Sequence, residues 1–453
     1  MDIKSEKKIF LIENNNIYQY IDLIGNVNLV KSKLIQEKNQ FSKNHSFLFQ
    51  YNSWFSFAVF YIAAKELNIT VEPTQENLNV SNKILLKSNG EEIKYLKKEY
   101  RNFCNNFEPG FIINSSGTTG KPKKIYLSYL RLNNSCLSIK KYMKTSYDDF
   151  HAWSMPPDYV YGLSMLNQVI NSNSSVYIID PIKNIKEIMD KLRQYKVNKL
   201  YGVPSGIKMI MKYGFNLISD YLKTIFIAGG RCDKNLAELI SQRGIKVCVM
   251  YGCTEASARL TYIFDDINEI GKGCVGIPID GVDIKILDNS MQNRLAIEEN
   301  ITGDIVFKSD YSFLGSFENN NVKITNDNEW IETGDIGYIL NGKLFITGRK
   351  ARFAKIGGIK ISLDEIEIFL NEIFNQNELA CIRKDNGNDT DDIYCIIVSR
   401  FSNEELKSKF VNYCLKNNKY PKWRIAIKFI NCKTIPKSKN GKSNYKILEK
   451  FIK

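Results

Sequence analysis

Between residues 175 and 250, short apolar runs alternate regularly with longer amphipathic segments, and few folds accommodate this pattern. We predict strands at 176–180, 199–203, 222–228 and 246–250, separated by helices at 182–195, 205–213 and 233–243. An alternation of this period is typical of a mostly parallel sheet with helices on its faces. Such a sheet binds ligands beyond the carboxyl ends of its strands, so the loops after these strands are the expected place of a site.

The segments on either side predict a second sheet and a separate small domain. Residues 1–40 predict short helices and strands, 46–50 and 68–72 predict strands, and 54–67 predicts a buried helix. After Gly271 shorter strands, at 282–287, 304–308 and 343–347, indicate an antiparallel subdomain. Beyond Arg349 we predict strands at 379–382, 393–398 and 425–430 and helices at 403–415 and 444–451. These elements suffice for a small α+β domain, so we predict a large domain at 1–348 and a small, mobile domain at 349–453.

The composition is that of a globular protein. The chain has 453 residues, of which 43% are hydrophobic, enough to bury a sizeable core. It shows neither a signal segment nor an apolar run of membrane-spanning length, so we expect a cytoplasmic protein without membrane insertion. Ten cysteines occur without a C-x-x-C pair, and the only histidines are His45 and His151. This composition disfavours a zinc site and favours reduced thiols.

The net charge of +14 comes mostly from the end of the chain. Residues 407–453 contain fourteen Lys or Arg and a single acidic residue, Glu449. One interpretation is a solvated, lysine-rich face. The other is a docking surface for an acidic partner, either an acyl carrier protein or the phosphates of coenzyme A. Because no nucleic-acid motif accompanies the charge, we expect no nucleic-acid partner.

The stretch 111–125 has the composition of an anion-binding loop. An apolar run gives way to Ser, Thr, Gly and Lys residues, whose hydroxyls, backbone N–H groups and ammonium groups suit a triphosphate or pyrophosphate. It is not the G-x-x-x-x-G-K-[ST] loop, because Pro122 follows Lys121 and the first glycine of that pattern is replaced by Ser115. The alternative is an ordinary solvated turn. The candidate nucleotide-binding residues are Ser115, Ser116, Gly117, Thr118, Thr119, Gly120, Lys121 and Lys123.

This loop resembles the phosphate loop of the adenylate-forming superfamily, which comprises acyl- and aryl-CoA synthetases, nonribosomal-peptide adenylation domains and luciferase-like ligases. Further segments resemble motifs of that superfamily and follow one another in the same order. They are Met155–Gly162, Ala228–Arg231, Met250–Glu255, Trp330–Tyr338, Thr347–Arg349 and Ile435–Lys442. The linker after Arg349 is most similar to a subgroup of these ligases associated with surface-saccharide biosynthesis.

The resemblance implies a role for most of the candidate nucleotide contacts. Tyr251 would stack on the purine, Thr254 would hold a phosphate oxygen, and Glu255 would be the ligand of Mg²⁺. Asp335 would accept both ribose hydroxyls, and Arg349 would contact phosphate or ribose at the domain boundary. The flexible strand-end turns on the adenine side are expected at Gly229, Gly230, Arg231 and Gly252.

The resemblance also implies the catalytic residue and the substrate pocket. Lys442 matches the lysine of the small domain that offsets the charge developing on the acyl phosphate, and we expect it to be catalytic together with Thr254 and Glu255. Tyr159 stands where many acyl-CoA synthetases carry histidine and would close the acid pocket. Asp158 is either a counter-ion for a substrate ammonium or an exposed turn residue. The pocket would also include Gly202, Val203 and Pro204, unless this segment only precedes a helix that begins at Ser205.

One departure concerns the pivot about which the small domain would rotate. The superfamily usually has an aspartate two residues after the arginine, whereas this chain has Ala351 followed by Arg352. Domain rotation is therefore expected, but its pivot residue is not identified.

The expected reaction is ATP- and Mg²⁺-dependent activation of a carboxylic acid, possibly an amino acid, followed by transfer to a phosphopantetheine thiol. Our leading hypothesis places that thiol on an acidic acyl carrier protein, and the alternative uses free coenzyme A. A third hypothesis, from another class, is a catalytically degenerate nucleotide-binding partner protein. The sequence identifies neither the acid nor the oligomeric state.

Overall fold

A computed structural model describes most of the chain. The described residues are 6–38, 45–99, 108–115, 123–181, 183–218, 220–288, 294–295, 300–318, 321–325, 329–350, 352–356, 359–374, 378–384, 391–417, 421, 424, 426–437 and 443–452. The chain divides into two compact units. Unit 1 comprises residues 1–284 and 307–331, and unit 2 comprises residues 285–306 and 332–453.

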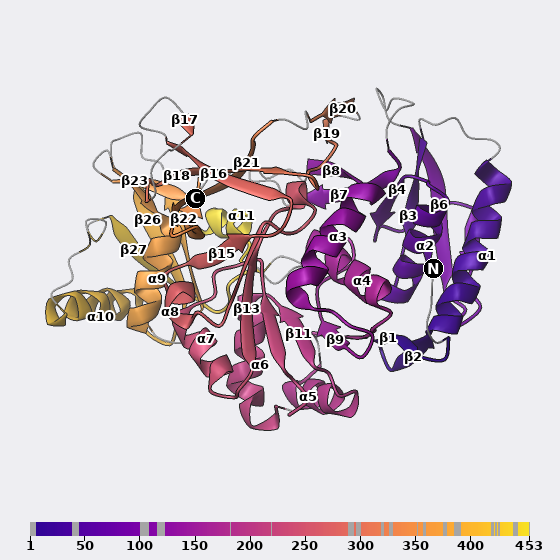
Figure 1. Ribbon diagram of the computed structural model, residues 1–453. Coiled ribbons are helices and arrows are strands. Elements are labelled where there is room, and N and C mark those ends of the chain that lie inside the picture. The colour runs from indigo at the N-terminus through magenta and orange to yellow at the C-terminus, as the bar shows by residue number, and fades with distance from the viewer. Residues whose placement is uncertain are drawn as a thin grey trace. The chain divides into compact units, whose positions relative to one another are not determined.

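Unit 1 contains a largely parallel sheet that corresponds to the predicted alternating region (Figure 1). Its strands in spatial order are β2 (Asn16–Gln19), β1 (Ile9–Glu13), β10 (Ser175–Ile178), β9 (Phe150–Trp153), β11 (Lys199–Gly202), β12 (Thr224–Ile227), β13 (Lys246–Tyr251), β14 (Thr261–Phe264) and β15 (Cys274–Pro278). Strands β1, β10, β9, β11, β12 and β13 run parallel, and β2, β14 and β15 are antiparallel additions at the edges.

The helices of this region connect its strands. Helices α5 (Ile185–Gln194), α6 (Pro204–Gly214) and α7 (Lys234–Ser241) pack against one another in chain order, and α7 also packs on β13. Helix α7 begins after Asp233, whose side chain accepts the backbone N–H of Leu236 at 2.8 Å. Two short helices, η1 (Phe215–Leu217) and α8 (Ile267–Gly271), complete this part of the unit.

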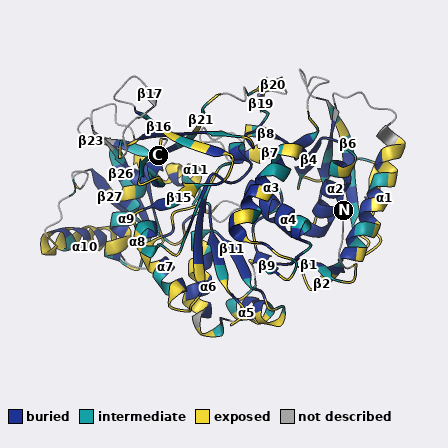
Figure 2. Cartoon of the chain, viewed as in Figure 1, coloured by how far each residue is buried: buried dark blue, intermediate teal, exposed yellow. Residues whose placement is uncertain are grey.

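A mixed sheet forms the rest of unit 1. Its strands in spatial order are β20 (Asn321–Ile324), β19 (Gly315–Glu318), β8 (Lys123–Ser128), β7 (Gly110–Ser115), β4 (Val71–Thr74), β3 (His45–Gln50), β6 (Glu92–Glu99) and β5 (Lys83–Leu85). The helices in this part are α1 (Tyr20–Lys38), α2 (Trp54–Glu66), α3 (Tyr129–Met143) and α4 (Val160–Ser172). Every residue of α2 from Trp54 to Ala64 is buried, so this apolar helix is the centre of the core (Figure 2).

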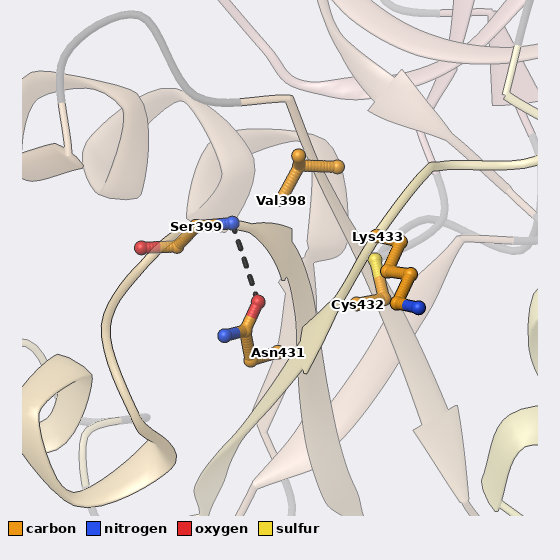
Figure 3. Close-up of a pocket in the computed structure, with 5 residues that line it drawn as sticks. All are labelled: Val398, Ser399, Asn431, Cys432 and Lys433. Carbon is orange, nitrogen blue, oxygen red and sulfur yellow. Dashed lines mark hydrogen bonds between the residues drawn. The ribbon is translucent and has the colours of Figure 1, made fainter.

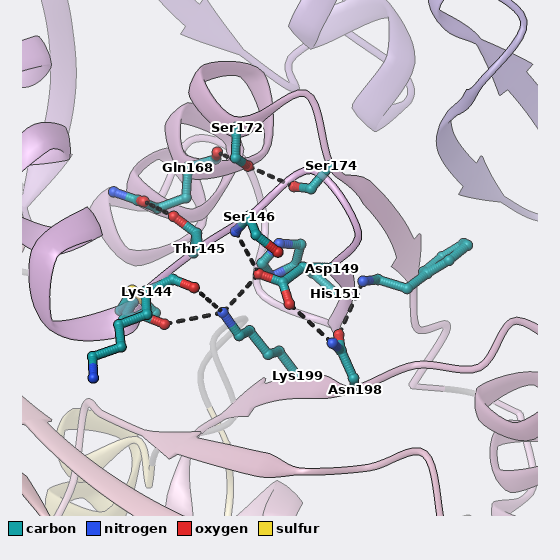
Figure 4. A network of polar contacts seen from close by, with 12 residues as sticks. Lys144, Thr145, Ser146, Asp149, His151, Gln168, Ser172, Ser174, Asn198 and Lys199 are labelled. Carbon is teal, nitrogen blue, oxygen red and sulfur yellow. Dashed lines mark hydrogen bonds and ion pairs between the residues drawn. The ribbon is translucent and has the colours of Figure 1, made fainter. Parts of the chain in front are cut away.

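A polar network is buried at the start of strands β9 and β11 (Figure 4). The Lys199 ammonium lies 2.7 Å from the Asp149 carboxylate and donates to the carbonyls of Met143 and Lys144. Asn198 donates to the other Asp149 oxygen at 2.9 Å. Burial alone would raise the pKa of Asp149, but the hydrogen bond and charge of Lys199 outweigh it and lower that pKa. A charge buried with this many partners is fully compensated.

Unit 2 consists of antiparallel strands followed by an α+β arrangement. Its elements are β16 (Val282–Asp288), β17 (Arg294–Leu295), β18 (Gly303–Ser309), β21 (Ile331–Leu340), β22 (Lys343–Arg349), β23 (Phe353–Ile356), β24 (Ile359–Ser362), α9 (Leu363–Phe374), β25 (Leu379–Lys384), β26 (Asp392–Val398), α10 (Asn403–Lys416), β27 (Ile427–Cys432), α11 (Tyr445–Leu448) and η4 (Glu449–Ile452). Alternate residues of β25, β26 and β27 face two cores, one formed with α9 and α10 and the other with Ile435 and Leu448.

The predicted fold class is confirmed. Helix-covered, mostly parallel strands occur in the large part of the chain, antiparallel strands follow, and a small α+β arrangement ends it. One detail of the prediction was wrong, since helix α6 begins at Pro204 rather than Ser205, because proline suits the first turn of a helix. The predicted boundary between residues 348 and 349 divides a large domain from a small domain that moves. It stays a prediction.

Thiols and helix hydropathy bear on two of the compositional expectations. The nine cysteines in the described part of the chain all carry free thiols. Among the described residues, no helix has the length and hydropathy needed to cross a membrane. The predicted cytoplasmic location stays a prediction.

Candidate functional site

Two candidate nucleotide segments and one candidate substrate segment of unit 1 follow the carboxyl ends of three neighbouring strands. Gly202 at the end of β11 pairs with Ile227 at the end of β12, and Ile227 pairs with Val249 near the end of β13. The loops after these strands carry the segments 203–204, 228–231 and 252–255. Parallel sheets of this kind bind ligands at this edge, so the site stays predicted here.

The loop after Tyr251 is short and tightly held. It returns at once to the sheet, because the backbone N–H of Leu260 donates to the Tyr251 carbonyl at 2.8 Å. A Cβ atom on Gly252 would lie 2.1 Å from the Ala258 carbonyl oxygen, so only glycine fits there. Ser257 and Ala258 adopt φ of 50° and 98°, a conformation that non-glycine residues rarely take. The loop is therefore fixed by its packing despite backbone strain.

Thr254 and Glu255 lie on a short helix, η2 (Thr254–Ala256), within this loop. The Glu255 carbonyl accepts the backbone N–H of Phe313 at 2.8 Å, which fixes the position of the residue. Among the residues the structure describes, none forms a hydrogen bond or ion pair with the half-buried Glu255 carboxylate. A carboxylate held by its backbone and otherwise unpaired fits a ligand of Mg²⁺, and the Thr254 hydroxyl beside it fits a phosphate contact.

The glycine turn after β12 allows a close approach to its backbone. Gly229 has φ of 80°, and a Cβ on Gly230 would press against the Pro204 ring at 3.2 Å. Arg231 is exposed, and its Nη2 donates to the Gly271 carbonyl at 3.0 Å. The two glycines fit a surface that accepts a flat base. The role of Arg231 stays a prediction.

The ends of the candidate phosphate loop are held together by strand pairing. Strands β7 and β8 form an antiparallel pair in which Ser115 lies opposite Lys123. Ser115 is buried and Lys123 is exposed. The candidates between them, Ser116, Gly117, Thr118, Thr119, Gly120 and Lys121, lie outside the described residues.

The candidate substrate gate precedes helix α4. The helix packs directly on the preceding prolines, because a Cβ on Gly162 would lie 2.2 Å from the Pro156 carbonyl oxygen. Tyr159 is the residue before the helix and contacts the core of unit 1. Asp158 is hydrogen bonded to the Tyr51 hydroxyl, whose pKa is raised by burial and then by this carboxylate. Asp158 is thus not simply an exposed turn residue.

Two candidate ribose and phosphate contacts pair within unit 2. Strands β21 and β22 are antiparallel with Asp335 opposite Arg349, and Arg349 Nε lies 3.0 Å from Asp335 Oδ1. The Asp335 N–H donates to Thr333 Oγ1 at 3.1 Å, in a turn where Gly334 has φ of 77°. Lys350, which sequence reasoning missed, bridges Asp304 at 2.7 Å and Glu332 at 3.1 Å.

Lys442 and Ala351 lie outside the described residues, but their neighbours are well defined. Lys437 and Ser443 form an antiparallel bridge that brings the two ends of the lysine loop together. Arg352 lies 2.6 Å from both Asp364 and Glu367, and its guanidinium stacks 3.8 Å from the Tyr445 ring. Within unit 2, one arginine thus connects the start of the small domain with the segment after Lys442.

The cavities in the described chain include one in each unit. One is formed in unit 2 where β26 and β27 end, by Val398, Ser399, Asn431, Cys432 and Lys433 (Figure 3). The other, in unit 1, is bordered by residues that include Glu13, Ser53, Gln75, Pro156 and Asp180. Neither contains a candidate nucleotide-binding residue.

The fold and the loop chemistry fit an enzyme that binds a nucleotide at the edge of an α/β sheet. Residues 57–317 match the family model described as AMP-binding enzyme. The chain belongs to this family, and the predicted class of AMP-forming acid-thiol ligase is confirmed.

Curated relatives include 2-succinylbenzoate--CoA ligases. The one from Listeria monocytogenes serovar 1/2a is 25% identical over 339 residues, which cover 73% of this chain and 68% of the relative. The one from Bacillus cereus is 27% identical over 260 residues, which cover 56% of this chain and 53% of the relative. Across these ligases, the matched region covers between about half and two thirds of the relative's own length.

Solved structures of similar fold cover almost the whole chain. O-succinylbenzoate coenzyme A synthetase from Bacillus subtilis, in complex with ATP and magnesium ion, has a TM-score of 0.77 and 18% identity and covers 96% of this chain and 95% of its own. ATP-bound MatB from Rhodopseudomonas palustris has a TM-score of 0.79 and 17% identity and covers 99% of this chain and 97% of its own. At these identities the likeness establishes the fold alone.

Proposed function

We propose that this protein is an acid–CoA ligase, which joins a small carboxylic acid to coenzyme A at the expense of ATP and releases AMP and pyrophosphate. The observation that carries the proposal is the grouping of Tyr251, Thr254 and Glu255 with the Gly229 turn at one sheet edge. The similarity to 2-succinylbenzoate--CoA ligases supports coenzyme A as the acceptor. It favours our original alternative over the carrier-protein hypothesis, which the comparisons do not support.

In the proposed first step, a carboxylate oxygen of the acid attacks the α-phosphate of ATP. The glycine turn at Gly229 and the face of Tyr251 would bind adenine, and Asp335 would accept the ribose hydroxyls. Thr254 and the loop from Ser115 to Lys123 would hold phosphate oxygens. Bound Mg²⁺, with Glu255 as its protein ligand, would supply charge neutralisation for the phosphates.

Lys442 is the proposed catalytic residue of this step. An ammonium positioned between the carboxylate and the α-phosphate stabilises negative charge that develops in the transition state. Rotation of residues 349–453 would then admit the thiol of coenzyme A, with the lysine-rich end of the chain facing its phosphates. Arg349 marks the start of the proposed moving part.

For the carrier-protein alternative the comparisons give only a likeness of fold. A structural neighbour with a TM-score of 0.74 and 17% identity is the McyG A-PCP protein in complex with phenylalanyl-adenylate. The basic end of the chain suits either an acidic carrier domain or coenzyme A, so charge alone does not separate the two.

The proposed function is tested in two stages. Acid-dependent exchange of labelled pyrophosphate into ATP, measured over aryl, aliphatic, keto and amino acids, reports the first step alone. We expect exchange with a non-amino carboxylic acid, followed by acyl transfer to coenzyme A. Exchange followed by transfer only to carrier proteins would restore the carrier hypothesis. ATP binding without exchange for any acid would favour the degenerate nucleotide-binding protein.

A further inference from the structure

The cavity of unit 1 lies where parallel strands of both its sheets end. Strands β1, β10 and β9 of one sheet run parallel, as do β3 and β4 of the other, and the chain enters the cavity wall at the carboxyl end of each. The volume of the cavity is about 240 Å³. Carboxyl ends of parallel strands are where sheets of this kind bind ligands, so the cavity has the position of a binding site.

This cavity is formed by other residues than the predicted nucleotide and acid contacts. None of those predicted contacts is among its described lining residues. Its wall does include Pro156 and Pro157, which precede the candidate gate residue Tyr159, and Tyr51, whose hydroxyl is hydrogen bonded to Asp158. The cavity therefore adjoins the candidate gate and is an additional feature of the unit.

The lining combines acidic residues with aromatic and apolar ones. Glu13 and Asp180 line the cavity, and no Lys, Arg or His is among its described lining residues. Tyr51 and Trp54 are the aromatic members of the wall, and prolines and isoleucines complete its apolar part. Carboxylates next to aromatic side chains suit a cation that carries a hydrocarbon group.

Glu13 has backbone partners but no cation. Its two carboxylate oxygens accept the N–H of Trp54, at 3.1 and 2.9 Å. Burial raises the pKa of this carboxyl to about 7, the nearby Glu91 raises it further, and no described lysine or arginine is among the groups that act on it. Glu91 accepts the Ser53 hydroxyl at 2.6 Å, whereas its other oxygen is buried without a hydrogen-bond partner in the described part of the chain.

Elsewhere the chain pairs enclosed carboxylates with its own cations. The carboxylates of Glu72, Asp149, Asp304 and Glu367 each lie within 3.1 Å of a lysine or an arginine. With 63 Lys and Arg against 49 Asp and Glu, the chain has cations to spare. Because an enclosed carboxylate is stabilised by a cation, we expect the partner of Glu13 to come from outside the chain.

The cavity suits an organic cation better than a metal ion. Ca²⁺ and Mg²⁺ take six or more oxygen ligands, and no group of three or more metal-binding side chains occurs among the described residues. A volume of about 240 Å³ is far larger than a bare ion and is close to the lower end of small-molecule sites, which is about 300 Å³.

We infer that this cavity binds a small organic ammonium ion, a primary amine with a short hydrocarbon chain, whose charged end contacts Glu13. The three N–H groups of an ammonium match the acceptor-rich side of the cavity, and the hydrocarbon chain lies along its aromatic and apolar side. This ligand is distinct from ATP, the acid and the thiol, so the inference goes beyond the proposed function.

The test is calorimetric titration of the full chain without ATP or acid. The probes are butylamine, phenethylamine and putrescine, each compared with the alcohol of the same carbon skeleton, which has nearly the same shape without the charge. We expect at least one amine to bind with one-to-one stoichiometry and about tenfold or more tightly than its alcohol, because charge-assisted hydrogen bonds are about twice as strong as neutral ones.

Matched variants locate the bound amine. Glu13→Gln retains the shape of the side chain without its charge, so it should weaken amine binding by about tenfold or more and alcohol binding by less than about twofold. Glu66→Gln is the control, because Glu66 lies at the other end of helix α2 and pairs with Lys31 at 2.7 Å. The control changes the net charge equally and should leave amine binding within about twofold. Asp180→Asn, on the other side of the cavity, should weaken the amine by about threefold or more.

Proton release gives a readout that general charge attraction does not. At about pH 6 the free Glu13 is mostly protonated, and a bound cation favours its ionised form, so binding should release up to one proton per amine. Calorimetry in two buffers of different ionisation enthalpy measures this release. The ionisable neighbours Tyr18, Glu91, Tyr51 and Asp180 all remain in Glu13→Gln, so loss of the release in that variant assigns the proton to Glu13.

The outcomes are separate from those of the proposed function. Equal affinity for amines and their alcohols overturns the inference, and so does an amine preference that survives Glu13→Gln. An equal loss of amine binding in Glu66→Gln shows only general charge attraction and also overturns it. None of these measurements needs ATP, an acid or coenzyme A, so the ligase assignment is tested independently by pyrophosphate exchange.

Discussion

Arg349 Nε lies 3.0 Å from Asp335 Oδ1, although fourteen positions separate the two residues in the chain. The antiparallel pairing of β21 with β22 places them opposite each other. The Asp335 side chain is 8% exposed and that of Arg349 is 50% exposed, so the carboxylate is fixed inside the strand pair and its partner reaches solvent. A carboxylate fixed in this way suits a contact with the ribose hydroxyls, and the arginine beside it suits a contact with a phosphate.

Asp335→Asn should weaken ATP binding by roughly tenfold to hundredfold, because hydrogen bonds to a charged group contribute about 1.5–3 kcal/mol. The measurement is the dissociation constant of ATP from calorimetry or ligand-induced thermal shift. Asp391→Asn is the matched control, since Asp391 is 4% exposed and pairs with the 46% exposed Arg383 at 3.2 Å. Both variants should be similarly destabilised, and equal ATP binding by the two would contradict a ribose role for Asp335.

Lys442→Ala should lower the rate of acid-dependent pyrophosphate exchange by about 10²–10³-fold, the effect of removing one group that stabilises transition-state charge. ATP binding should change much less. Lys437→Ala is the control within the same segment, because Lys437 only reaches Glu378 at 3.5 Å near the surface. A Lys442→Ala protein with the exchange rate of Lys437→Ala would show that the catalytic assignment is wrong.

Much of the fold was predictable because its signals are local. Short apolar runs and their spacing identified the parallel strands, and a largely apolar stretch identified the buried helix α2. Helix α1 was read only as short pieces, since its asparagines and glycine give it a weak pattern. Strand β6 was not predicted. Only one face of this strand packs on the core, through Ile93 and Tyr95, and the lysines and glutamates between them obscure the apolar pattern.

The candidate site was predictable as motifs but not as contacts. The Tyr251 loop and the Asp335 turn carry residue types whose chemistry is visible in the sequence. The burial of Arg259 was not visible, because it arises from tertiary packing. Likewise, Arg352 was noted only beside the missing pivot aspartate, whereas its contacts with Glu367 and Tyr445 depend on chain segments far apart in sequence.

Glu367→Gln should lower the stability of unit 2 by about 1.5–3 kcal/mol, because it removes one of the two carboxylates that lie 2.6 Å from the buried Arg352 and leaves Asp364 as the other. Urea unfolding followed by near-ultraviolet circular dichroism measures the effect. Tyr445→Phe is the milder comparison, since it retains the ring over Arg352 and loses only hydroxyl contacts of 3.4 Å. It should change stability by less than about 1 kcal/mol. Equal effects of the two substitutions would contradict a central role for the Arg352–Glu367 pair.

Glu13 should make folding stability fall as the pH rises from about 4.5 to 7. Burial raises the pKa of this carboxyl to about 7, and the nearby Glu91 adds to the rise, although the backbone N–H groups of Trp54 and Phe55 oppose it. Between the ordinary value of 4.5 and the folded value, the folded state therefore binds the proton more tightly than the unfolded state.

The size of this effect follows from the shift, since one pKa unit corresponds to about 1.4 kcal/mol and the total is therefore about 3 kcal/mol. Glu13→Gln cannot ionise, so its stability relative to the wild type should increase by that amount between pH 4.5 and pH 8. Urea unfolding of both proteins across this range isolates the contribution of Glu13, because all other groups titrate alike in the two. A difference that stays constant with pH would show that the helix N–H groups of Trp54 and Phe55 hold Glu13 ionised in the folded state.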